Sequence, residues 1–209
     1  MKGICFKEPL FQATVEGRKT QTRRIMTPQP TGDLYGFVGY TRQTIDQVLR
    51  YFDFTCGVTT SPKYQVGEVV YLKEPYSYVG GYYDKALPVT IYKYGNNPGN
   101  YIGENWRNKL FMPESAARHF IKITAVRPER LQDISEGDCF REGIMDTDFG
   151  GMQCVVYGLS SGLFFTELGS TPEKAYATLI DKINGRGAWD SNPWVWVYDY
   201  ALWHKEKER

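Results

Sequence analysis

Gly17-Arg18-Lys19-Thr20-Gln21-Thr22-Arg23-Arg24 places four cationic side chains and two threonines within eight residues. Phosphate oxygens and developing oxyanions both need charge-assisted donors at close range, so this composition is typical of a compact anion site. The alternative interpretation is the basic, solvated edge of a strand, which is common on protein surfaces. The choice between the two depends on how the rest of the chain surrounds this stretch.

The residues that flank this stretch predict a strand, a short helix and a second strand. Residues 4–6 form a short apolar run. Pro9 then stands where the first turn of a helix tolerates proline, and Gly17 stands where a helix ends. We therefore expect Lys19 on the turn after this helix and residues 22–25 on the following strand.

The charge of the whole chain predicts no partner, but its distribution does. The 209 residues include 25 Lys and Arg against 24 Asp and Glu. Residues 1–30 carry six of these cations and two glutamates. Such a local excess can attract a polyanion without making the whole protein basic.

Cysteine and hydrophobicity patterns predict a cytoplasmic protein with no cofactor. Cys5, Cys56, Cys139 and Cys154 lie far apart, without the short spacing that zinc ligation favours. No apolar run approaches the length of a membrane span, and the N-terminal residues lack a signal-peptide pattern. We therefore expect reduced thiols, no bound metal and no membrane partner.

Short strands, separated by few helices, dominate the remaining sequence. β-Branched and aromatic runs predict strands over residues 69–74, 89–94, 119–126 and 195–202. Capping residues predict one helix beginning near Ser135 and another over residues 171–183. An apolar stripe predicts a further helix over residues 41–50.

These elements predict an α+β fold with a mixed β-barrel or curved sheet and helices at its edge. Strands and helices do not alternate regularly, which argues against a doubly wound sheet. The chain contains neither an internal repeat nor a low-complexity tract. We expect a single domain over residues 1–209, with insertions at about 30–60, 78–105 and 146–170.

The order of several motifs resembles the ASCH domain, a PUA-like β-barrel family associated with RNA and modified nucleosides. The basic stretch at residues 17–24 is followed by Val66-Gly67-Glu68-Val69-Val70-Tyr71-Leu72-Lys73-Glu74, Phe111-Met112-Pro113 and Ile123-Thr124-Ala125-Val126-Arg127. The later motifs Glu129-Arg130-Leu131-Gln132-Asp133-Ile134-Ser135 and Trp189-Asp190-Ser191-Asn192-Pro193-Trp194-Val195-Trp196-Val197-Tyr198 resemble the longer variant found in phages and prophages. The resemblance implies a PUA-like fold.

The resemblance also implies a catalytic set of Lys19, Thr22 and Glu74. Small ASCH amidohydrolases remove an acyl group from the exocyclic nitrogen of acetylated cytidine with a Lys, a Thr and a Glu at these motif positions. A threonine hydroxyl needs a neighbouring base, and a lysine is a base only where burial or nearby cations lower its pKa. The alternative is that Lys19 and Glu74 form a structural ion pair and that Thr22 is an ordinary strand residue.

Other polar and aromatic residues are candidates for binding nucleic acid or a smaller ligand. They are Arg18, Arg23, Arg24, Tyr76, Ser115 and Arg118. Tyrosines can stack on bases, and cations or hydroxyls can contact phosphates. The alternative is that the tyrosines pack in the core and the polar residues lie on solvated turns. Trp194 and Trp196 alternate with valines and are expected to pack in the barrel.

Three functions stay open at this point. The first is a protein that binds RNA or a modified nucleotide in a basic cleft. The second is an amidohydrolase acting on nucleobases of the N4-acetylcytidine type. The third is a nuclease-like or accessory phage protein. No protein partner is evident from the sequence.

Overall fold

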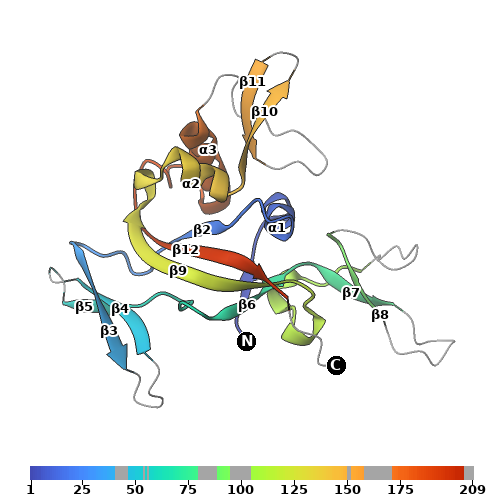
Figure 1. Cartoon of the computed structure of the whole chain (residues 1–209), viewed down its shortest axis with the longest axis horizontal. Helices are drawn as coiled ribbons and strands as arrows, with labels where there is room; N and C mark the ends of the chain where they lie inside the picture. The colour runs from blue at the N-terminus through green and yellow to red at the C-terminus, as the bar shows by residue number, and fades with distance from the viewer. Residues whose placement is uncertain are drawn as a thin grey trace.

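A five-stranded sheet with the order β1-β6-β9-β12-β2 forms the centre of the molecule (Figure 1). The computed structural model describes residues 1–40, 47–53, 55, 57–79, 89–94, 105–149, 152–157 and 171–204. The central strands are β1 (Gly3–Cys5), β2 (Gln21–Ile25), β6 (Val69–Lys73), β9 (Phe120–Arg130) and β12 (Trp194–Trp203). β1 runs parallel to β6, and the other pairs of this sheet are antiparallel.

Alternating apolar residues place one face of the long strands in the core. Ile121 and Ile123 on β9 are buried, and so are Val195 and Val197 on β12. β12 lies between β9 and β2, with a register shift between Asp199 and Tyr200 in its pairing with β9. An irregularity of this kind bends a strand, in keeping with the curvature of β9 and β12 in Figure 1.

Three helices lie along one side of the central sheet (Figure 1), namely α1 (Glu8–Val15), α2 (Glu136–Arg141) and α3 (Pro172–Asn184). The Ser135 hydroxyl caps α2 by accepting from the Asp138 N–H, and Thr171 caps α3 in the same way. α3 buries Tyr176, Leu179 and Ile180 in the core. Both predicted helix starts are confirmed. None of the helices in the described part of the chain has the length and apolarity needed to span a bilayer.

Smaller sheets and single turns extend from this centre. The antiparallel sheets are β3 (Leu34–Tyr40) with β4 (Gln47–Asp53) and β5 (Val58–Thr60), β7 (Tyr76–Val79) with β8 (Val89–Tyr92), and β10 (Ile144–Phe149) with β11 (Met152–Tyr157). The turns are the 3₁₀-helices η1 (Lys109–Phe111), η2 (Glu114–Ala116) and η3 (Leu131–Asp133). Figure 1 shows the three small sheets at separate places around the central one.

The α+β class predicted from sequence is confirmed, and two finer expectations need correction. Residues 47–50 of the predicted helix lie in β4 instead, where pairing with β3 overrides the helical stripe. Residues 41–46 lie outside the described residues. Among the described strands the sheet does not close into a barrel, because β1 and β2 stay as its two edges. The edges are instead separated by the cavities described below.

Candidate ligand-binding site

The edge strands β1 and β2 approach each other across a gap that we call the seam. The Arg24 guanidinium spans it, with Nη2 donating a hydrogen bond of 2.8 Å to the Cys5 carbonyl. A cavity of about 510 Å³ opens here, and a smaller one of about 170 Å³ adjoins it. Cys5, Arg24 and Ile25 line both cavities. A ligand can therefore reach the sheet at the seam.

The larger cavity combines cations with aromatic rings. Arg24, Lys63 and Lys73 line it, and the described residues of its lining include no Asp or Glu. Its aromatic lining consists of Tyr64, Trp196 and Tyr198. A concave surface with several positive charges and no lining carboxylate concentrates positive potential, which favours an anionic ligand.

The cations of the larger cavity contact carbonyl oxygens and rings. Lys73 Nζ donates a 2.8 Å hydrogen bond to the Leu110 carbonyl and lies 5.6 Å from the centre of the Tyr71 ring. Lys63 Nζ lies 5.3 Å from the centre of the Tyr64 ring. Among the described residues, no carboxylate lies within ion-pair distance of Arg24, Lys63 or Lys73. These charges remain available to an incoming anion.

The smaller cavity brings together two of the three residues predicted to be catalytic. Lys19 and Thr22 both line it, beside Glu142. The Lys19 ammonium is 1% exposed and donates to the Gln21 carbonyl at 2.7 Å, to the Glu142 carbonyl at 2.8 Å and to Glu142 Oε2 at 2.5 Å. Because an ammonium has three N–H groups, these acceptors occupy all of them.

Burial lowers the pKa of Lys19, and the nearby cations Arg24 and Arg23 lower it further. The charge and hydrogen bond of Glu142 oppose this change without reversing it. A lowered pKa is the property required of a lysine base. It is equally the property of a lysine that is buried for structural reasons.

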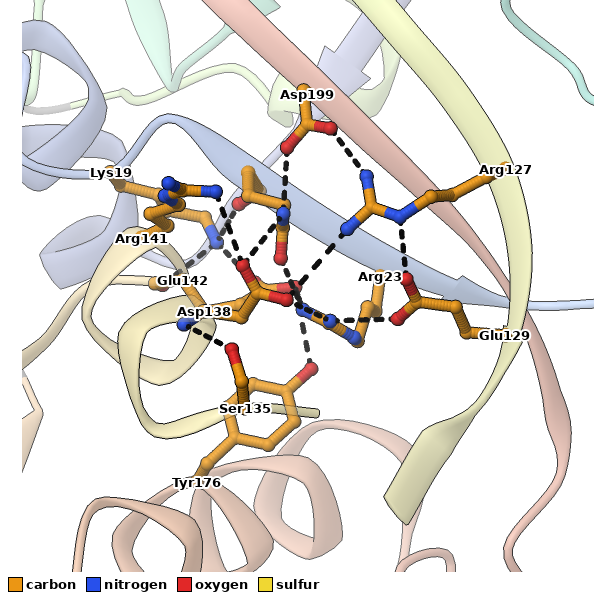
Figure 2. Close-up of polar contacts among 11 residues, drawn as sticks. Lys19, Arg23, Arg127, Glu129, Ser135, Asp138, Arg141, Glu142, Tyr176 and Asp199 are labelled. Carbon is orange, nitrogen blue, oxygen red and sulfur yellow. Dashed lines mark hydrogen bonds and ion pairs between the residues drawn. The ribbon is translucent and has the colours of Figure 1, made fainter. Parts of the chain in front are cut away.

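Arg23 sits in a buried network of charges that Figure 2 shows in full. Its guanidinium is 0% exposed and lies 3.0 Å from Glu129, 3.0 Å from Asp138 and 3.6 Å from Glu142. The Tyr176 hydroxyl of α3 also contacts Glu142, at 3.4 Å. Arg23 therefore has three carboxylate neighbours, whereas its neighbour Arg24 has none among the described residues.

The network joins the sheet to α2 and balances its own charge. Arg127 on β9 pairs with Glu129 and with Asp199 of β12, each at 2.5 Å. The Gln21 amide donates to Asp199 at 2.6 Å and to Asp138 at 3.3 Å. Its cations are Lys19, Arg23, Arg127 and Arg141, and its carboxylates are Glu129, Asp138, Glu142 and Asp199. Four positive and four negative charges therefore cancel. We call this set the buried network, with Arg141, 62% exposed, at its outer edge.

Glu74 lies away from both cavities, and the predicted ion pair between Lys19 and Glu74 is wrong. Glu74 is 0% exposed and accepts two hydrogen bonds from Arg118, at 2.8 and 2.9 Å. Burial raises the pKa of Glu74, and Arg118 partly opposes this rise. Lys19 is paired with Glu142 because the turn after α2 brings that carboxylate against the start of β2.

The remaining predicted ligand residues do not line the seam cavities. Arg18 pairs with Glu16, Tyr76 is 4% exposed in contact with Tyr78, and Ser115 is exposed on η2. The Arg118 guanidinium stacks over the Tyr92 ring at 4.1 Å besides holding Glu74. Of the predicted binding residues, the structure thus brings Arg23 and Arg24 to the cavities. Both terminal nitrogens of Arg23 already have partners, whereas its buried Nε has none among the described residues.

Sequence reasoning missed several residues of the seam. Lys63, Lys73 and Lys109 come from three separate segments, and no local pattern connects them. Trp196 is 6% exposed and packs as predicted, but it also forms part of the cavity wall. Pairing of β12 with β2, which sets Trp196 opposite Arg24, is what brings this ring to the seam.

Comparison of the chain with family models, with curated proteins and with solved structures finds no match. Among the described residues, no group of three or more His, Cys, Asp or Glu side chains gathers in a way that could hold a metal ion. The interpretation of the site below therefore depends on its own residues and geometry.

Proposed function

We propose that this chain binds a phosphorylated nucleoside, free or within an RNA strand, in the larger cavity of the seam. The observation that carries the proposal is the lining of Arg24, Lys63 and Lys73 without a carboxylate among the described residues. Its volume of about 510 Å³ falls within the range of about 300–1,000 Å³ that small-molecule sites occupy.

The aromatic lining favours a nucleotide over a simple phosphate as the anion. Tyr64, Trp196 and Tyr198 are 3%, 6% and 1% exposed and form an apolar wall of the cavity that the cations also line. A base can contact this wall while arginine and lysine bind the phosphates.

Substitutions in the cavity test this function against a matched control. Arg24→Gln and Lys73→Gln each remove one charge from the seam, whereas Arg141→Gln removes a charge that is 62% exposed and outside both cavities. Binding of a fluorescent single-stranded RNA is measured by anisotropy over a series of salt concentrations. Each seam variant should weaken binding and reduce the salt slope by about 0.7, the value for one lost phosphate contact on a single strand.

The control variant should bind as the wild type does. If Arg24→Gln and Lys73→Gln retain the affinity and the salt slope of the wild type, the seam is not the binding site. If Arg141→Gln weakens binding as much as they do, the effect belongs to overall charge rather than to the cavity.

A second candidate function is hydrolysis of an acylated nucleobase in the smaller cavity. The observation that favours it is that Lys19, with a lowered pKa, lines this cavity together with Thr22. Glu142 occupies the place beside Lys19 that Glu74 was predicted to hold. In this reaction water cleaves the amide bond, and acetate and the free exocyclic amine leave as products.

Acetate release from N4-acetylcytidine separates the two functions. The hydrolase hypothesis predicts that Lys19→Ala and Thr22→Ala abolish release, and that Glu74→Gln retains it because Glu74 lies outside the cavity. The rate should increase with pH as Lys19 loses its proton. If folded wild-type protein releases no acetate above background from either the nucleoside or acetylated RNA, the hydrolase hypothesis fails. The binding proposal then remains.

A further inference from the structure

Phe111 is the most exposed large apolar side chain in the described part of the chain. It is 80% exposed, and Leu110 beside it is 58% exposed. Burying a phenylalanine contributes about 1.5–3 kcal/mol, so a chain that leaves the ring in water forgoes that contribution. Single exposed apolar residues are common on protein surfaces, and Phe111 differs from them in how its backbone is held and in which residues lie next to it.

Phe111 belongs to η1, a turn held in place by hydrogen bonds from several segments. Lys73 Nζ donates to the Leu110 carbonyl at 2.8 Å, and Lys109 Nζ donates to the Phe6 carbonyl at 2.5 Å. The Tyr71 hydroxyl donates to the carbonyl of the buried Met112 at 3.0 Å. The ring is thus presented on an anchored backbone.

Two of the three residues that anchor η1, Lys73 and Lys109, are also cations that line the seam cavities. Leu110 and Lys73 line the larger cavity, and Lys109 lines the smaller one. Phe111 lines neither cavity itself, but it directly follows Lys109 and Leu110, so its exposed side chain belongs to the same anchored turn as two residues of the cationic cleft. An aromatic face next to a basic groove is the arrangement by which proteins bind single-stranded nucleic acid, since unpaired bases offer a free face for stacking.

We infer that Phe111 stacks on an unpaired base of a single-stranded nucleic acid whose backbone phosphate lies in the seam. This inference rests on the proposed function and narrows its ligand to a single strand longer than one nucleotide. A double helix does not fit, because its bases stack on one another and offer no face to the ring. Phe111 supplies stacking, while Arg24 and Lys73 supply the phosphate contacts.

The test compares strands that carry bases with a strand that does not. The probes are fluorescent oligouridylate, its duplex with oligoadenylate, and an abasic strand of the same length, with a single-stranded DNA to compare sugars. Phe111→Ala should weaken binding of oligouridylate by about five- to 150-fold, as expected for one lost stacking contact. Binding of the abasic strand should not change, and Phe111→Trp should restore the affinity.

Matched variants test the stacking role of Phe111 separately from ligand binding at the seam. Tyr35→Ala removes another exposed aromatic, 57% exposed and outside both cavities, and should bind as the wild type. If Arg24→Gln weakens binding while Phe111→Ala does not, the stacking role of Phe111 is refuted and ligand binding at the seam is retained. If the wild type binds none of the strands, both proposals fail.

Two further outcomes overturn the stacking role. One is an equal loss by Phe111→Ala on the abasic strand and on oligouridylate, because no base is present there to stack. The other is a wild-type dimer in sedimentation that Phe111→Ala dissociates without any change in oligonucleotide affinity. That result would assign the ring to contact between two copies of this chain.

Discussion

Arg23 and Arg24 are adjacent in the sequence, yet their substitution should have opposite consequences. The side chain of Arg23 is 0% exposed and is surrounded by Glu129, Asp138 and Glu142. Arg24 is half-buried at the seam, where its guanidinium donates to a backbone carbonyl. We expect Arg23→Gln to affect mainly stability and Arg24→Gln mainly ligand binding.

The expected magnitudes follow from what each substitution leaves behind. Removing one partner of a buried ion pair costs about 3–5 kcal/mol, because the other charge stays buried without compensation. Arg23→Gln leaves three carboxylates near one another, so the variant should lose at least this much free energy of unfolding. Arg24→Gln removes one partly exposed hydrogen bond, with a net contribution of about 1 kcal/mol.

Urea denaturation distinguishes these values. With a slope of about 2–3 kcal/mol per molar for a chain of this size, Arg23→Gln should lower the midpoint by about 1–2 M, and Arg24→Gln by less than about 0.5 M. At low urea, the folded fraction of Arg23→Gln should bind single-stranded RNA as the wild type does. Equal midpoints for the two variants would refute the assignment of Arg23 to the buried network. The assignment would also be refuted if folded Arg23→Gln lost affinity for RNA while folded Arg24→Gln kept the affinity of the wild type.

Two further predictions concern the carboxylates. Burial raises the pKa of Asp138, but the hydrogen bond and charge of Arg23 lower it overall below the ordinary 3.8. The carboxylate therefore stabilises the fold above that pH, and the stability difference between wild type and Asp138→Asn in urea should shrink as the pH falls through the lowered value. Arg118→Met should cost about 3–5 kcal/mol, because it strands the buried Glu74. The pKa of Glu74, already raised by burial, should then rise further, and the Arg118→Met variant should therefore regain stability as the pH falls. At neutral pH, adding Glu74→Gln to Arg118→Met should restore part of the lost stability.

The elements that sequence patterns predicted well are those whose signals are local. The cap at Ser135, the helix after Thr171 and the alternation along β9 and β12 all depend on residues within a few positions of one another. The segment at residues 47–50 was wrongly predicted as a helix because antiparallel pairing with residues 37–40 of β3 outweighed its helical stripe. A strand depends on its partner as well as on its own apolar pattern, and the stripe alone does not report that partner.

The structure places part of the predicted site at the seam but gives Lys19 a partner other than the predicted one. The basic stretch at residues 17–24 does contribute to the seam, through Lys19, Thr22 and Arg24. The partner of Lys19 is Glu142, more than one hundred residues away, and α2 must pack on β2 before the two meet. A glutamate in the turn after a short helix carries no signal of that role.

Strand geometry divides one basic motif between two roles. Side chains of successive residues in a strand point to opposite faces, so Gln21 and Arg23 enter the buried network while Arg24 reaches the seam. The pairing of Trp196 with Arg24 and of Val197 with Arg23 fixes this division. A shift of β2 by one residue would exchange the two faces, placing the Arg24 charge in the network and leaving Arg23 at the cavity. The buried network, by holding this register, thus sets which arginine the seam presents to an anion.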